Sequence, residues 1–119
     1  MAVKLEVGMD QIVHICSLED WQDAQTAGIY RAESLEAEGF IHCSRPEQVV
    51  EVANRYYGGR TDLLILWIDP SKLAVELRWE ASEEEIYPHI YGPINLAVII
   101  QVSEFLPDDD GVFRSLQAQ

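Results

Sequence analysis

Three histidines stand out as side chains that could do chemistry. His14 lies in the β-branched run at 12–16, His42 follows Gly-Phe-Ile at 39–41, and His89 lies in a segment with two prolines. An imidazole changes charge near neutral pH, so it can transfer a proton, hold an anion or ligate a metal. A single histidine in a strand is more often a core residue bonded to a carbonyl group. Three in predicted strands favour the alternative, and we expect them to line one polar cleft.

The first two histidines share a local pattern. Each is followed within three residues by a cysteine and then a serine, Ser17 after His14 and Ser44 after His42. Both serines are predicted to cap a following helix, because a side-chain oxygen there accepts from the first free backbone N–H groups. The N-terminus of a helix attracts phosphate or carboxylate groups. The pattern therefore predicts an anion site beside His42 and Ser44.

The third histidine lies in a stiff segment. Residues 87–93 read Tyr-Pro-His-Ile-Tyr-Gly-Pro, in which two prolines restrict the backbone and two tyrosines add rigid rings. Such stiffness suits a side chain that must be positioned, so His89 is a candidate catalytic residue. The histidines show no His-x-His or His-x-x-x-His spacing, and no metal site is predicted.

Glu80 is a candidate acid. It follows Trp79 near the end of a predicted strand, where an apolar neighbour would raise the pKa of its carboxyl group. The other interpretation, an exposed acid at a strand end, is the commoner role of glutamate. The nearby run 83–85 is interpreted as a solvated charged turn.

The hydrophobic pattern predicts about six strands and two helices. Helices are expected after Ser17, ending at Gly28, and after Ser44, ending at Gly58. Because both helices fall in the first half, we predict an α+β fold with a mixed, mostly antiparallel sheet. The domain is expected at 11–106, with an N-terminal extension at 1–10 and an acidic turn and C-terminal tail at 107–119. The strands are expected at 11–16, 39–43, 63–68, 75–79, 86–90 and 95–102.

The composition limits the partners of this acidic protein. The 119 residues include 21 acidic and 8 basic side chains, which gives a formal net charge of −13. Such a charge repels polyanions, and the chain lacks the basic stripe that a nucleic-acid backbone requires. We therefore expect a small-molecule or nucleotide ligand and no extended nucleic acid, and the oligomeric state is left open.

The apolar runs, the N-terminal residues and the number of cysteines also indicate the cellular compartment. No apolar run approaches the ~20 residues of a membrane span, and residues 1–10 lack the apolar region of a signal peptide. We expect a cytoplasmic protein with no membrane partner. Its two cysteines, Cys16 and Cys43, are predicted to be reduced thiols, since disulfides are rare in that compartment.

Two segments carry a resemblance to a known family. Gly-Phe-Ile-His-Cys-Ser at 39–44 and Pro-His-Ile-Tyr-Gly-Pro at 88–93 resemble the bacterial domain-of-unknown-function family 952 (DUF952), and the match runs from about Gln11 to Phe105. That family is similar to a minimal ADP-ribosyltransferase fold, distantly related to the RNA 2′-phosphotransferases. The resemblance implies a split, mostly antiparallel sheet and a cleft for NAD.

The resemblance also implies roles for individual residues. In enzymes of the ADP-ribosyltransferase fold, the third sequence motif usually supplies a catalytic acid, and in this chain either Glu80 or His89 would take that position. His14 would hold the ribose of NAD. The implied function is that of an NAD-dependent transferase or hydrolase, and the alternative is a non-catalytic module that binds a nucleotide or another small molecule. The implied catalytic residues are His42, His89 and Glu80, and the implied cofactor contacts are His14, Ser44 and Tyr91.

Overall fold

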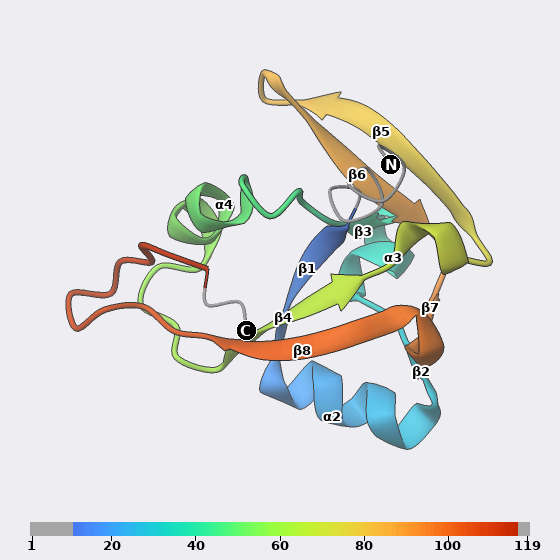
Figure 1. The fold of residues 1–119 in the computed structure, drawn as a ribbon, viewed down its shortest axis with the longest axis horizontal. Helices are drawn as coiled ribbons and strands as arrows, with labels where there is room; N and C mark the ends of the chain where they lie inside the picture. The colour runs from blue at the N-terminus through green and yellow to red at the C-terminus, as the bar shows by residue number, and fades with distance from the viewer. Residues whose placement is uncertain (1–10, 117–119) are drawn as a thin grey trace, which may run out of the picture.

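The computed structural model describes residues 11–116, which form three small antiparallel sheets accompanied by three α-helices (Figure 1). The predicted extension at 1–10 and the last three residues, 117–119, lie outside the described residues. Short 3-10 turns occupy Pro70–Lys72 and Leu96–Val98. The other elements are β1 (Ile12–Ser17), α2 (Leu18–Ala27), β2 (Ile29–Tyr30), α3 (Glu33–Glu38), β3 (Ile41–His42), α4 (Val49–Tyr56), β4 (Leu63–Ile68), β5 (Glu76–Ser82), β6 (Glu85–Tyr91), β7 (Ile94–Asn95) and β8 (Ile99–Phe105).

The first sheet has the strand order β1–β4–β8, and β4 is its central strand. Nearly every residue of β4 is buried, as its continuous apolar sequence predicts. Successive side chains of a strand point to opposite faces. Leu66 and Ile68 accordingly join one core cluster, whereas Ile65 and Trp67 join another. One strand therefore connects two layers of apolar packing.

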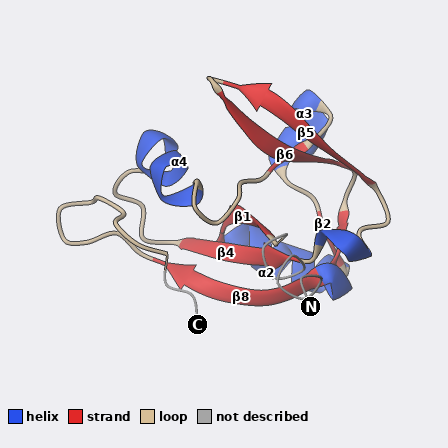
Figure 2. Cartoon of the chain, turned by 45° about the horizontal axis from the view of Figure 1, so that its top comes forward, coloured by secondary structure: helices blue, strands red, loops and turns tan. Residues whose placement is uncertain are grey.

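The third sheet, β3–β6–β5, lies apart from the first, and Figure 2 shows its β5–β6 hairpin above the layer that contains β1, β4 and β8. The two sheets meet at Ser44. Its backbone N–H and C=O pair with those of Val13, each with a donor–acceptor distance of 2.8 Å. The next residue back, Cys43, donates its N–H to the carbonyl oxygen of Pro88 at 3.1 Å. The segment 41–44, called the seam below, thus places β3 between β1 and β6.

The α+β class and the antiparallel pairing are confirmed, but the expected six strands and two helices are wrong in number. Residues 11–116 contain eight strands in three sheets and three α-helices. The predicted strand 39–43 pairs only at Ile41–His42, and the predicted strand 95–102 is divided by the turn Leu96–Val98. Strands of two residues carry too little alternation to be recognised in a sequence. The charged segment Glu33–Glu38 forms the additional helix, ended by Gly39 with a φ of 92°.

Only one of the two predicted helix caps forms. Ser17 Oγ accepts from the backbone N–H of Asp20 at 3.0 Å, at the start of α2. Ser44 does not cap α4, because its backbone is paired with Val13 and residues 45–48 separate it from the first helical residue. The cap position of α4 is Gln48, which makes no side-chain cap bond. The predicted Ser44 cap is therefore wrong, and the anion site beside His42 loses the helix N-terminus on which it was predicted.

The segment after β8 packs back onto the domain. Phe113 is buried and stacks on Phe105, with ring centroids 4.6 Å apart. The side-chain amide of Asn54 donates to the carbonyl oxygen of Phe113 and accepts from its N–H, both at 2.8 Å. These contacts attach the C-terminal segment to α4.

Cys16 and Cys43 are free thiols buried in the first core cluster, as predicted. Burial raises the pKa of Cys16 to about 12, and it raises the pKa of Cys43 as well. Both thiols are therefore protonated and unreactive at neutral pH. Across residues 11–116, no helix has the length and apolar character that crossing a membrane would require.

Candidate functional site

A cleft of about 690 Å³ is bordered by β1, the seam, α4 and the tip of the β5–β6 hairpin. Its size falls within the ~300–1,000 Å³ typical of small-molecule sites. Glu80 and Tyr91 are not among the lining residues and connect to the cleft through His89. The structure thus brings the three histidines together around one space. The candidate residues that line the cleft are His14, His42, Ser44 and His89.

His14 is buried, and both of its ring nitrogens are engaged. Nδ1 lies 2.6 Å from the backbone oxygen of His42, and Nε2 lies 2.8 Å from the hydroxyl oxygen of Tyr30. Because a carbonyl oxygen only accepts, Nδ1 carries the proton, and Nε2 of the neutral ring accepts from Tyr30. Burial lowers the pKa of His14 from 6.5 to about 4, so the ring is neutral at pH 7. Its bond to His42 ties β1 to β3.

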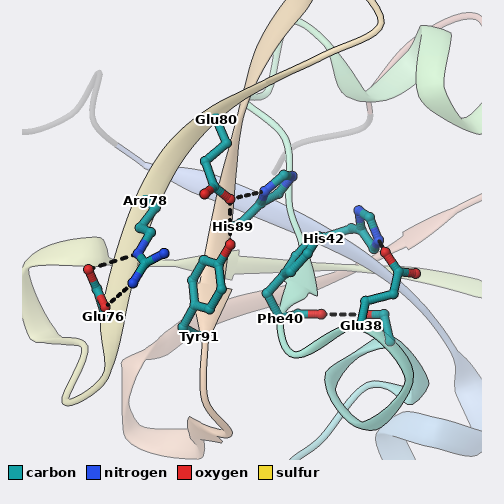
Figure 3. Close-up of polar contacts among 9 residues, drawn as sticks. Glu38, Phe40, His42, Glu76, Arg78, Glu80, His89 and Tyr91 are labelled. Atoms are coloured by element: carbon teal, nitrogen blue, oxygen red, sulfur yellow. Dashed lines mark hydrogen bonds and ion pairs between the residues drawn. The ribbon is translucent and has the colours of Figure 1, made fainter.

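His42 is the exposed member of the three, with 54 % of its side chain accessible. Its Nε2 lies 3.1 Å from Glu38 Oε1, at the end of α3. Phe40 packs against both cleft-facing imidazoles, edge-on to His42 with centroids 4.8 Å apart and stacked on His89 at 4.2 Å. The centroids of the two imidazoles are 5.5 Å apart (Figure 3). Phe40 therefore fixes the spacing of two groups that could act on one ligand.

His89 is bonded to a carboxylate on the neighbouring strand. Glu80 Oε1 lies 2.7 Å from His89 Nδ1 and also accepts from the Tyr91 hydroxyl at 2.6 Å (Figure 3). An ionised carboxylate only accepts, so Nδ1 carries the ring proton. Within residues 11–116, no hydrogen bond is made to His89 Nε2, and no fully buried side-chain nitrogen lacks a partner. His89 lines the cleft although only 7 % of its side chain is exposed, so Nε2 is the ring nitrogen left for a cleft ligand.

The state of Glu80 differs from the expectation. Tyr91 and His89 both donate to its carboxylate and hold the pKa of that group below its ordinary value. The predicted rise is wrong, because the apolar neighbour Trp79 points to the opposite face of β5 and is itself half exposed. Glu80 is ionised at neutral pH and serves as a fixed acceptor for His89.

Comparison with known proteins establishes the family. The family described as Protein of unknown function (DUF952) matches residues 15–102. The chain belongs to this family. The crystal structure of protein CC0527 from Caulobacter crescentus is similar at 31 % identity with a TM-score of 0.80, over 87 % of this chain and 93 % of that chain. Its solution NMR structure gives a TM-score of 0.76 at 31 % identity, over 87 % and 91 % of the two chains. The comparison with curated proteins gave no match.

The cleft of this DUF952 protein has further polar residues that sequence analysis missed. Tyr30 reaches it from β2, Glu38 from the end of α3, and Arg55 and Tyr56 from the last turn of α4. The sequence signal for two of these residues is the polar and aromatic segment Arg-Tyr-Tyr at 55–57, which precedes Gly58-Gly59. In the described part of the chain, no three His, Cys, Asp or Glu side chains are grouped closely enough to hold a metal ion.

Proposed function

We propose that this DUF952 protein binds NAD or a related nucleotide in the cleft and, as an ADP-ribosyltransferase-like enzyme, transfers the ADP-ribosyl group of NAD to an acceptor with release of nicotinamide. One observation carries the proposal. His89 has Nδ1 bonded to an ionised carboxylate and Nε2 left for a cleft ligand, and it faces His42 with 5.5 Å between ring centroids. An imidazole oriented by a carboxylate is a recurrent arrangement for a general base.

The Glu80–His89 pair supplies the proton acceptor. By accepting from Nδ1–H, Glu80 leaves the lone pair of Nε2 for the proton of an acceptor hydroxyl. The imidazolium that forms is stabilised by the same carboxylate. Tyr91 donates to Glu80 and fixes its position, so we assign Tyr91 as a positioning residue. Of the two alternatives for the third motif position, His89 contacts the ligand and Glu80 acts through it.

NAD supplies a glycosidic bond to a cationic nicotinamide leaving group, and breaking that bond places positive charge on the ribose. Glu38 beside His42 and Glu80 behind His89 are carboxylates near this space. Negative side chains held in advance near developing positive charge lower the barrier. The net charge of −13 makes a small or proteinaceous acceptor more suitable than RNA.

The remaining cleft residues fit the ribose and the rings of such a ligand. Nε2 of neutral His14 is a hydrogen-bond acceptor engaged by the Tyr30 hydroxyl, so a ribose hydroxyl would bind His14 by taking the place of that donor. Tyr57 and Tyr87 line the cleft and offer aromatic faces for a base. Two antiparallel sheets joined at one seam support the likeness to a split-sheet fold. Ser44 would contribute through its place on the cleft wall rather than as a helix cap.

The proposal is tested by titrating 15N-labelled protein with NAD and then assaying free nicotinamide. We expect amide shifts concentrated in β1, the seam and β6, followed by slow nicotinamide release. Binding without release would assign the chain as a nucleotide-binding module, and absence of any binding would refute the proposal.

A matched pair of variants separates chemistry from structure. Glu80→Gln retains the size of the side chain and removes the charge behind His89, so nicotinamide release should fall on the order of a hundredfold with little change in NAD affinity. Glu76→Gln removes a carboxylate from the same face of β5 that contacts Arg78 and not His89. Equal activity of the two variants would contradict the assigned role of Glu80.

A further inference from the structure

The tip of the β5–β6 hairpin is attached to both ends of α4 by polar contacts. At the start of the helix, Gln48 donates to Glu85 Oε1 at 2.9 Å and to the carbonyl oxygen of Ile86 at 3.1 Å. One oxygen of Glu83 accepts from Arg55 Nη1, and the other accepts from the hydroxyl of Tyr56 at 3.0 Å. All three of these residues line the cleft. Figures 1 and 2 both place the tip on the side of the molecule where α4 lies. A polar contact between two separate elements therefore borders one part of the cleft.

The backbone of this tip is unfavourable for its residues. The hairpin turn consists of Glu83 and Glu84, with φ angles of 53° and 74°. A two-residue turn with both φ angles positive strongly prefers Asn-Gly, because side chains with a Cβ resist the left-handed region. Within residues 11–116 these are the only non-glycine residues with positive φ. The turn places the Glu83 carboxylate against Arg55 despite this preference.

The partner of Arg55 is the carboxylate of Glu83, and a phosphate group can take the place of a carboxylate beside a guanidinium. A guanidinium presents a planar fork of donors that fits carboxylate and phosphate alike. Its other carboxylate neighbour, Glu51, lies one turn earlier on α4, with Oε2 3.5 Å from Arg55 Nη2. Exposed ion pairs of this sort contribute little net stability, so an incoming anion can displace Glu83 easily.

Arg55 differs from Arg60, the other arginine that lines the cleft, in which element supplies its carboxylate partner. Arg60 donates twice to Asp62, two residues along the chain, and lies over the Tyr57 ring with its guanidinium carbon 5.8 Å from the centroid. That pair is local to one segment and does not depend on the hairpin. Arg55 is thus the cleft arginine that has a counter-ion from a separate element, Glu83, in addition to Glu51 on its own helix.

We propose that Arg55 binds a phosphate group of the ligand, and that in the ligand-free protein the carboxylate of Glu83 occupies the place of that phosphate. This inference rests on the proposed function for the identity of the ligand, a nucleotide with a pyrophosphate. It adds Arg55 as a residue that selects ligands with a phosphate group, and Glu83 as an intramolecular competitor for the position of that phosphate. Glu83 lowers the affinity for every phosphate-bearing ligand and leaves phosphate-free ones unaffected.

The test is calorimetric titration of the parent protein, Glu83→Gln, Arg55→Gln and the control Glu84→Gln. The probes are NAD, inorganic pyrophosphate and nicotinamide riboside, which has no phosphate. We expect Glu83→Gln to bind NAD and pyrophosphate about tenfold more tightly than the parent and Arg55→Gln to bind them about tenfold more weakly. Nicotinamide riboside should bind all four proteins equally.

Glu84→Gln removes the same charge from the same turn. Among the described residues the Glu84 carboxylate makes no hydrogen bond or ion pair with Arg55, so this variant should match the parent. If it tightens NAD binding as much as Glu83→Gln, only the overall charge matters and the inference is overturned. If NAD binds the parent but Glu83→Gln binds it no better, the inference fails while the proposed function stands. If pyrophosphate shows the expected pattern and NAD binds none of the proteins, the phosphate site stands and the proposed function fails.

Discussion

The buried histidine of the cleft makes the stability of the fold depend on pH in a defined window. Burial lowers the pKa of His14 from 6.5 to about 4. Between these values the unfolded chain binds a proton that the folded protein does not, so stability falls as pH falls. The contribution is fully present above pH 6.5 and is lost progressively as pH falls toward 4. The full loss corresponds to about 3 kcal/mol, at about 1.4 kcal/mol for each unit of pKa difference.

The perturbation is a fall in pH combined with the variant His14→Asn, whose side-chain amide can still donate to the backbone oxygen of His42. Urea unfolding measured at about pH 7.5 and about pH 5 should show the parent losing about 2 kcal/mol from this group. The variant starts less stable, because the acceptor for Tyr30 is lost, but its dependence on pH over this interval should be weaker by that amount. The structural carboxylates have lowered pKa values and act below this window.

His42→Gln provides the control, since the half-exposed His42 donates no side-chain group to the His14 ring. Because the charge of His42 is only the smallest of the causes that shift the pKa of His14, after burial and the backbone hydrogen bond, the slope of His42→Gln should stay much closer to that of the parent than the slope of His14→Asn does. Identical slopes for the parent and His14→Asn would show that His14 takes up its proton at the same pH in the folded and unfolded chains, and the lowered pKa of the buried ring would be wrong.

Three further results are expected. Gly92→Ala should destabilise the fold by about 1–3 kcal/mol in urea, because a Cβ there would lie 2.6 Å from Cγ1 of Val75; an unchanged midpoint would show that the two backbones can separate. Ser17→Ala should cost about 1 kcal/mol through loss of the α2 cap, and a neutral result would mean that water replaces the hydroxyl. Cys16 and Cys43 should react with iodoacetamide at least about a hundredfold more slowly in the native protein than in urea, because burial raises their pKa values; equal rates would contradict their burial.

Features governed by local chemistry could be predicted from the sequence. The apolar run of β4 indicated a central strand, and Ser17 and Gly28 marked the two ends of α2. The expectation that the three histidines share a cleft rested on their strand placement, the shared His-Cys-Ser pattern and the stiff segment around His89, although the cap predicted by that pattern at Ser44 does not form. Each of these signals is contained within a few neighbouring residues.

The seam could not be predicted in the same way. Ser44 has the sequence neighbours of a helix cap, including Glu47 three residues later, yet its N–H and C=O are engaged by Val13 from a strand 31 residues away. That pairing leaves Ser44 extended, so the helix begins only at Val49. A local preference worth about 1 kcal/mol was outweighed by two backbone hydrogen bonds between sheets.

The contact between Glu80 and His89 could not be predicted because it depends on the register of the β5–β6 hairpin. Once Ser82 is known to pair with Glu85, antiparallel register places His89 opposite Arg78 and diagonal to Glu80, within reach of its side chain. The register follows from a two-residue turn at 83–84, and the sequence there lacks every usual turn residue. Such an exception is expected where function outweighs conformational preference. Glu83 lies in this turn, whose sequence does not indicate a turn, and its carboxylate also accepts a hydrogen bond from Arg55. The turn that is hard to recognise in the sequence therefore lies at the border of the cleft.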